Sequence, residues 1–369
     1  MIVLHKKREE GRSMNIGLIG LANSGKTTIF NAMTRTQAQI TEYINAKSEP
    51  NRAMMKVEDS RVTILSDIYM PKKTTYAVIE LIDFIGLTEG SAKEGLFSSS
   101  SMGLIKNTDA LAIVVRHFNN DTAGISTPLR DIAKIDEELL ISDLLIAENR
   151  LERIKKAYQQ GKKNNSLEME EKILHKIIGH LSNNQPIREL ELDGDHEKML
   201  RGFQFLTQKP TIVILNSEET NFGKDNDLLE KIGTNHRVIE FAGKFEMELS
   251  QLDDQESIDF FMADMGIHES ARDRLCRAAY EVLGYISFFT VGSDEVRAWS
   301  LHQGETAVFA AGTIHTDLAQ GFIRAECFSY EDLIECGSEK GVGKKGLLSL
   351  EGKEYIVRDG NILNIRFNI

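Results

Sequence analysis

Short apolar runs alternate with amphipathic stretches along much of the chain. Continuous apolar runs of roughly four to eight residues are typical of buried strands, whereas apolar positions three and four residues apart indicate helices. Strands of this kind are predicted at Asn15–Ile19, Ala77–Ile82, Leu111–Val115, Thr211–Leu215 and around Val238–Ile239. Because helical stretches separate them, the pattern predicts an α/β fold with a parallel sheet.

A long helical segment interrupts this alternation between residues 126 and 205. Apolar residues recur there at helical spacing, first from Ile132 to Tyr158 and again from Ile173 to Leu181. The polar stretch Gly161–Asn165 separates the two runs. We therefore predict an antiparallel helical hairpin inserted into the sheet domain. Its charged residues are typical of a solvated face, and a partner-binding role for them stays open.

A small separate module is predicted after a helix that ends near Leu283. From residue 285 onward the sequence shows short strands with turn signals and one small helix around Ala307–Ala311. The pair Asp359–Gly360 predicts a hairpin turn between Tyr355–Val357 and Ile362–Phe367.

These patterns divide the chain into four parts. Residues 1–13 form an extension before Met14, and residues 14–125 together with 206–284 form the sheet domain. Residues 126–205 form the inserted helical hairpin, and residues 285–369 form the C-terminal module.

Composition excludes several classes of protein. The chain has 369 residues, of which 41% are hydrophobic and 27% are charged, as expected for a folded globular protein. No apolar run approaches the roughly 18 residues that a transmembrane helix needs, so we expect no membrane partner. The three cysteines, Cys276, Cys327 and Cys336, fit a reducing cytoplasm. The net charge of −12 gives no general attraction to nucleic acid, and we expect no DNA partner.

The segment Gly20–Thr27 follows the first predicted strand and reads G-x-x-x-x-G-K-T. Its glycines allow successive backbone N–H groups to turn inward around phosphates, Lys26 reaches the β/γ oxygens, and Thr27 offers its hydroxyl to Mg²⁺. The helix that starts near Lys26 adds the positive end of its dipole. The sequence therefore predicts a site for a nucleoside triphosphate with Mg²⁺.

Two further segments complete this predicted site. Asp83 ends a strand and Gly86 follows it, the arrangement of a Walker B aspartate that holds Mg²⁺ and a glycine N–H near the γ-phosphate. Asn216, Ser217 and Glu219 lie where a GTPase carries its base-reading N-K-x-D motif. Ser217 cannot pack on a base as lysine does, and Glu219 is one methylene longer than aspartate. We therefore expect weak guanine selectivity and recognition of adenine.

The predicted catalytic residues are Lys26, Thr27, Asp83 and Gly86. Thr27 and Asp83 are the predicted Mg²⁺ ligands. The predicted nucleotide-binding residues are Leu21, Ala22, Asn23, Ser24, Gly25, Lys26, Thr27, Thr28, Asn216, Glu219 and Ala242.

These residues resemble the YchF or Obg-like ATPases, a branch of the P-loop GTPase-related proteins, from about Met14 to Ile369. The most specific blocks are C-terminal, and they include Phe289–Gly292, Glu295–Trp299, Ile314–Asp317 and Gly321–Glu326. The resemblance implies a P-loop NTPase domain with a helical insertion and a small β-grasp-like TGS domain. It also implies a preference for ATP over GTP and association with ribosomes. Asn23 stands where potassium-stimulated relatives place an asparagine, so it is a candidate K⁺ ligand.

The chain departs from this family where the γ-phosphate is sensed. The first switch usually resembles F-x-T-I-x-P-N, and here Lys47 stands in the threonine position with Ser48 next to it. Part of the second switch is usually Gly-Leu-Gly-Asn. In this chain the corresponding residues, Gly95–Ser98, are Gly-Leu-Phe-Ser. Leu87 takes the place of the water-orienting glutamine of a Ras-like enzyme, as in the family. We therefore expect ATP binding with slow hydrolysis by a monomer. A GTP-binding Obg-type GTPase and a non-hydrolysing nucleotide-binding protein are the alternatives.

The C-terminal module carries one candidate contact for RNA. Arg297, Trp299 and Arg324 could form an aromatic and basic patch, or the tryptophan could be buried between surface arginines. The sequence leaves both interpretations open.

Overall fold

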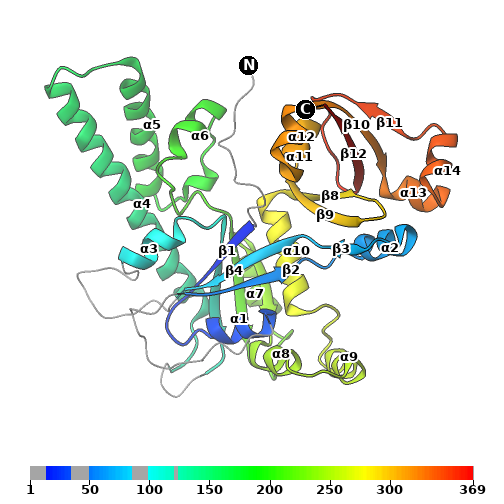
Figure 1. The fold of residues 1–369 in the computed structure, drawn as a ribbon. Coiled ribbons are helices and arrows are strands. Elements are labelled where there is room, and N and C mark those ends of the chain that lie inside the picture. Colours follow the sequence, from blue (N-terminus) through cyan, green and yellow to red (C-terminus); the bar gives the residue numbers. More distant parts are fainter. Residues whose placement is uncertain (1–13, 35–49, 85–98, 120–123, 369) are drawn as a thin grey trace. The chain divides into compact units, whose positions relative to one another are not determined.

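The computed structural model describes residues 14–34, 50–84, 99–119 and 124–368 (Figure 1). The chain forms two compact units. The described parts of Asn15–Ala53 and Leu81–Leu275 form the first unit, and Met54–Glu80 with Cys276–Ile369 form the second. No helix in the described ranges has a stretch long and apolar enough to cross a bilayer.

A six-stranded sheet organises the first unit, with the strand order β2-β4-β1-β5-β6-β7. Its strands are β1 (Met14–Ile19), β2 (Asn51–Lys56), β4 (Val78–Asp83), β5 (Ala110–His117), β6 (Thr211–Ser217) and β7 (Arg237–Phe241). Strands β1, β5, β6 and β7 run parallel to one another. The α/β prediction with a parallel sheet is therefore confirmed, and the carboxyl ends of these strands meet at one edge, where open α/β sheets bind their ligands.

The helices of this unit are α1 (Lys26–Thr34), α3 (Ser99–Ile105), α7 (Asn226–Gly233), α8 (Gly243–Leu249) and α9 (Gln255–Asp264). Helix α10 (Ala271–Leu283) begins in this unit, and its residues from Cys276 onward are grouped with the second. The sheet core includes the fully buried residues Ile113, Val213 and Leu215. The first turns of α4 (Pro128–Gln159) also belong to this core through Ile132 and Ile135.

A helical arm extends from the sheet, and Figure 1 shows α4 and α5 (Asn165–Ser182) side by side. The far half of α4 packs against α5, the 3₁₀ turn Ile187–Glu189 and α6 (Gly194–Leu200) in a core of its own. Gly161, with φ +76°, follows the end of α4. The Asn164 side chain then accepts the Leu167 N–H and begins α5. Buried Asp143 of α4 accepts the N–H groups of Leu206 and Thr207, where the chain returns to the sheet.

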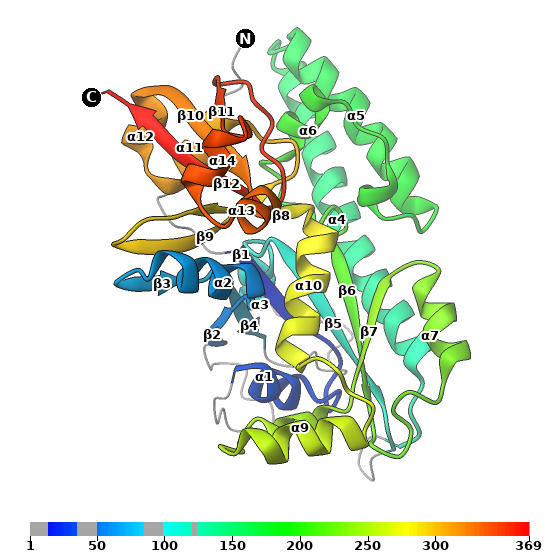
Figure 2. The ribbon, with the colours of Figure 1, turned by 90° about the vertical axis from the view of Figure 1, so that its right-hand side faces the viewer.

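The second unit contains a sheet with the order β11-β10-β12-β8-β9-β3, which Figure 2 shows in its upper part. The strands are β3 (Lys73–Thr75), β8 (Tyr285–Thr290), β9 (Glu295–His302), β10 (Phe322–Ser329), β11 (Ser349–Glu351) and β12 (Asn361–Phe367). The helices are α2 (Ser60–Tyr69), α11 (Ala307–Ile314), α12 (Thr316–Gln320), α13 (Tyr330–Cys336) and α14 (Glu339–Lys344). Phe288 and Phe289 enter different cores because successive strand residues point to opposite faces.

The segment Met54–Glu80 is grouped with this second unit, although the sequence analysis placed it in the sheet domain. Only its two ends, which belong to β2 and β4, pair in the first sheet. Strand β3 pairs in parallel with β9, with Lys73 opposite Glu295 and Thr75 opposite Arg297. Val62 and Leu65 of α2 are fully buried in a core that also contains Phe289. The guanidinium of Arg61 binds Asp59 at 2.8 Å and Asp359 at 2.6 Å.

The predicted hairpin around Asp359–Gly360 is wrong. A turn does form there, with Gly360 at φ +81°, but Tyr355–Val357 is not a strand. Ile356 makes only an isolated bridge to Thr306. Strand β12 instead pairs antiparallel with β10 and parallel with β8, so both of its hydrogen-bonding edges are occupied.

Candidate nucleotide-binding site

At two positions of the loop between β1 and α1, the backbone accommodates only glycine. Gly25 has φ +87°, and a Cβ atom there would lie 2.1 Å from Nδ2 of Asn216. A Cβ atom on Gly20 would lie 2.4 Å from the carbonyl oxygen of Val114. Asn23 also has a positive φ, of 59°, which asparagine tolerates better than most residues. The loop is therefore a tight bend at the carboxyl end of β1, followed directly by the N-terminus of α1, as an anion site requires.

Lys26 turns back over this bend. Its ammonium donates to the carbonyl oxygens of Gly20 at 3.0 Å and Leu21 at 2.9 Å. Burial lowers the pKa of Lys26 to about 8, and the negative charge of Asp83 opposes this shift. The ammonium is thus desolvated and held by neutral carbonyl groups, so an anionic phosphate is a better partner than those it has.

Thr27 and Asp83 meet across the loop. The Thr27 hydroxyl donates to Oδ2 of Asp83 at 2.9 Å, and the Asn51 amide donates to the same oxygen at 3.3 Å. Burial raises the pKa of Asp83, while Lys26 and these two donors lower it. A hydroxyl and one carboxylate side by side suit Mg²⁺, which takes one or two protein oxygens and completes its shell with phosphate and water. Within the described residues, no group of three or more His, Cys, Asp or Glu could hold a metal.

Asn216 connects the loop to the end of the sheet. Its amide donates to the carbonyl of Ser24 at 3.0 Å and its oxygen accepts the Gly243 N–H at 3.2 Å. The N–H of buried Ala242 donates to Glu246 at 3.0 Å. Exposed Glu219 lies in the turn that follows β6. Thus Asn216 and Ala242 border the phosphate loop, and Glu219 is on the surface two residues after β6 ends.

The remaining predicted residues lie along the loop. Leu21, Ala22 and Thr28 are half-buried, and the candidate K⁺ ligand Asn23 is exposed. Ser24 is buried, and its hydroxyl has no hydrogen-bond partner among the described residues. The predicted residue Gly86 lies outside the described residues, as do Leu87 and the altered positions of both switch segments, which are 47, 48 and 95–98.

Sequence reasoning missed several groups around the site. Asn51 supports Asp83, and Arg274 lies 4.4 Å above the Phe241 ring while donating to the carbonyl of Glu240 at 2.6 Å. Arg274 also binds the carboxylate of Glu246. The local signal for Asn51 was its place at the end of the first-switch motif, and the local signal for Glu246 was its position one helical turn after Ala242. Arg274 carries no motif and is brought in by packing alone.

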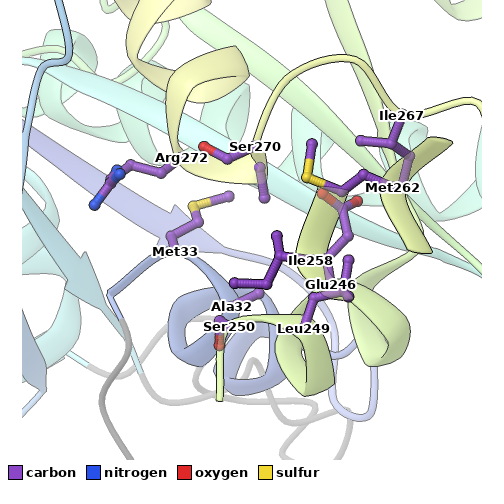
Figure 3. A pocket seen from close by; sticks show the side chains of 11 residues that line it. Ala32, Met33, Glu246, Leu249, Ser250, Ile258, Met262, Ile267, Ser270 and Arg272 are labelled. Atoms are coloured by element: carbon purple, nitrogen blue, oxygen red, sulfur yellow. The ribbon is translucent and has the colours of Figure 1, made fainter. Parts of the chain in front are cut away.

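A separate hollow of about 70 Å³ lies beside α1 (Figure 3). Met33, Leu249, Ile258 and Met262 contribute to its mainly apolar lining, and Glu246 reaches it from α8. None of its lining residues belongs to the phosphate loop. This hollow is therefore not the predicted nucleotide site.

In the second unit the three residues proposed for RNA contact do not form one patch. The guanidinium of Arg297 stacks 3.8 Å above the half-buried Trp299 ring, whose Nε1 donates to Thr290 at 3.0 Å. Arg324 is exposed on β10, and β12 and β8 separate that strand from β9. The structure thus brings together Arg297 and Trp299 without Arg324.

Comparisons with known proteins cover nearly all of the chain. A family model named YchF-GTPase_C, described as "Protein of unknown function (DUF933)", matches residues 285–368, and one described as "50S ribosome-binding GTPase" matches residues 15–217. A protein of Pasteurella multocida named "Ribosome-binding ATPase YchF" is 37% identical over 363 residues, covering 96% of this chain and 99% of its own length. A Bacillus subtilis protein of the same name is 35% identical over 97% of this chain and 100% of its own length. The solved structure of the Schizosaccharomyces pombe YchF GTPase matches 98% of this chain with a TM-score of 0.82 at 28% identity, and the match spans all of that structure.

Proposed function

This chain belongs to the YchF family, and from that membership we propose that it is a regulatory P-loop protein that binds ATP, hydrolyses it slowly and acts on the ribosome. Relatives that match it end to end are named ribosome-binding ATPases. The observation that carries the proposal is the convergence of Lys26, Thr27 and Asp83 beside one glycine bend, with Asn216 at its far side. We propose that the protein works as a monomer in the cytoplasm.

The loop is suited to hold the triphosphate. Its backbone N–H groups and the N-terminus of α1 face the phosphates, and Lys26 exchanges its two carbonyl partners for β/γ oxygens. Thr27 and Asp83 would hold Mg²⁺, which neutralises charge on the β and γ oxygens when it is bound. Hydrogen bonds from Asn51 and from the Thr27 hydroxyl keep the Asp83 carboxylate directed at the proposed Mg²⁺ position.

Base recognition by this chain favours adenine in our proposal. The Ser217 hydroxyl donates to Glu240 at 2.5 Å, so it is occupied within the protein, and it cannot cover a base as a lysine stem does. Because no aspartate accepts both guanine N–H groups, contacts with guanine add little binding free energy at this site. The predicted residue Glu219 stays a candidate for contact with the base.

Slow hydrolysis follows from the separation of binding and chemistry. The cradle holds the ground and transition states alike, whereas orientation of the attacking water favours the transition state only. Leu87 has an alkyl side chain and cannot orient water. We propose that stabilisation of the transition state comes from the ribosome, from a K⁺ ion near Asn23, or from both.

The decisive experiment measures binding and turnover of ATP and GTP, each with and without ribosomes and K⁺. We expect ATP to bind more tightly than GTP and to turn over more slowly than about 1 s⁻¹ alone, the lower end of ordinary enzyme rates. A Lys26→Ala variant identifies contaminating activity. Faster turnover without a partner would contradict slow hydrolysis. Preference for GTP would support the Obg-type alternative, and no product in a single turnover would support a non-hydrolysing binding protein.

A further inference from the structure

The carboxylate of Glu240, on β7, connects the two ends of the loop that follows β6. Its Oε1 accepts the Ser217 hydroxyl at 2.5 Å, and its Oε2 accepts the Gly223 N–H at 3.0 Å. The residue is 9% exposed, so these two donors compensate the burial of its charge. One buried carboxylate therefore closes a loop that starts directly after Asn216.

The loop between these two anchors is compact. The N–H groups of Asn221 and Phe222 both donate to the carbonyl of Glu218, at 2.9 and 3.0 Å. Gly223 then reverses the chain with φ +71°. Glu219 is an exposed residue within this turn. Its backbone position is thus fixed by the short turn and by the two hydrogen bonds to Glu240.

Two neighbours keep the Glu240 anchor in place. Since the Ser217 hydroxyl proton goes to Glu240, its oxygen accepts from Nδ1 of His117, 3.0 Å away. The other His117 nitrogen lies 3.4 Å from the carboxylate of Asp225, just beyond the loop. Arg274 binds the backbone carbonyl of Glu240 at 2.6 Å. The strand end, the loop and β7 are therefore held by one connected polar network.

We infer that Glu240 is a positioning residue for recognition of the base: it sets the loop Ser217–Gly223, and through it the preference for adenine over guanine, without touching the nucleotide. This inference rests on the proposed ATP binding. It assigns nucleotide selectivity to a network outside the phosphate loop. Glutamine in place of Glu240 keeps one accepting oxygen and removes the negative charge, so the charge-assisted bonds that hold the two loop ends are weakened.

The test compares Glu240→Gln with the wild-type chain by calorimetry, using ATP, GTP and inorganic tripolyphosphate as probes. We expect ATP affinity to fall about tenfold, the effect of weakened bonds to a buried charge, and the ATP-to-GTP ratio to shrink. Affinity for tripolyphosphate, which has no base, stays unchanged. Glu170→Gln is the matched control, since Glu170 is equally buried but pairs with Arg150 in the helical arm.

Each outcome decides the inference. Unchanged ATP affinity and selectivity in the variant, with normal ATP binding by the wild type, overturn the role of Glu240 alone. Equal losses for ATP and tripolyphosphate overturn it too, because they indicate general damage. If Glu240→Gln does not fold, Ser217→Ala takes its place, since it frees the Ser217 end of the loop and keeps the charge; it should weaken ATP but not tripolyphosphate. A wild-type chain that binds neither ATP nor GTP contradicts the proposed function itself.

Discussion

The side-chain amide of Asn216 donates to the carbonyl of Ser24 at 3.0 Å, although 192 positions separate the two residues. The same side chain accepts the Gly243 N–H. One asparagine thus fixes the phosphate loop against two strand ends of the sheet. The first prediction concerns this contact.

Asn216→Ala should weaken ATP binding by about tenfold or more and lower the unfolding free energy by about 1–3 kcal/mol, because it leaves the Ser24 carbonyl and the Gly243 N–H without their partner. Calorimetric titration and urea unfolding measure the two effects. Asn165→Ala, at an exposed site, is the control and should change neither. Wild-type affinity in Asn216→Ala would show that the loop keeps its shape without this contact.

Gly25→Ala should abolish ATP binding. The new Cβ would lie 2.1 Å from Nδ2 of Asn216, and the backbone has φ +87°, a conformation that costs an L-residue roughly 1–2 kcal/mol. The loop must therefore open or displace Asn216. The control is Gly194→Ala, where the added carbon meets no atom within 4 Å apart from its chain neighbours and the backbone of its own helix. We expect a change within about 0.5 kcal/mol there. Tight ATP binding by Gly25→Ala would refute the loop geometry.

ATP affinity should decline as the pH rises above about 8. In the free protein, burial lowers the pKa of Lys26 to about 8. A bound triphosphate would raise this pKa again because its negative charge favours the ammonium form. Above pH 8 the free ammonium has lost its proton, so binding must take one up, and affinity falls with increasing pH. Calorimetry in two buffers with different ionisation heats should detect this uptake. A Lys26→Arg variant stays charged and should lose the dependence. Equal proton uptake by both proteins would assign the effect to another group.

The same shift affects the stability of the free protein. A lysine pKa that is lower in the folded than in the unfolded chain means that the unfolded chain binds the proton more tightly between about pH 8 and 10.5. The penalty for burying Lys26 is therefore largest below pH 8 and decreases as the pH rises through that window. Thermal unfolding of the wild type and Lys26→Met should show a stability difference that narrows from pH 7.5 to pH 9.5.

Asp143→Ala should lower the unfolding free energy by about 3 kcal/mol. The fully buried carboxylate accepts the N–H groups of Leu206 and Thr207 and the Thr207 hydroxyl, so its loss leaves three donors unsatisfied. Urea unfolding measures the change. Asp195→Ala, which removes an exposed carboxylate from α6, should cost under 1 kcal/mol. A similar small effect at Asp143 would mean that water replaces these bonds.

Much of the first sheet and the phosphate loop could be predicted because their signals are local. The apolar run of β1, the spacing of glycines and the start of α1 all lie within Met14–Thr34. The parallel arrangement follows from alternating strands and helices. The approach of Thr27 to Asp83 was also predictable, because the carboxyl ends of parallel strands meet at one edge.

Contacts that depend on distant partners could not be predicted. Nothing local in residues 54–80 shows that β3 pairs with β9 or that Val62 is buried beside Phe289. The hairpin prediction at Asp359–Gly360 failed because strand pairing is decided by competition among several strands, and β10 and β8 occupy β12. The network of Glu240 was invisible for the same reason, since its donors belong to other segments.

The burial of α2 and β3 in the second unit imposes an order on biogenesis. Thr75 and its partner Glu295 are 220 positions apart. At a synthesis rate of about 5–20 residues per second, residues 54–80 leave the ribosome roughly 10–40 seconds before the strand that covers them. Throughout that interval Val62 and Leu65 lack their native cover, and exposed apolar surface of this kind is what chaperones bind. A gene shortened at residue 284 would make this exposure permanent.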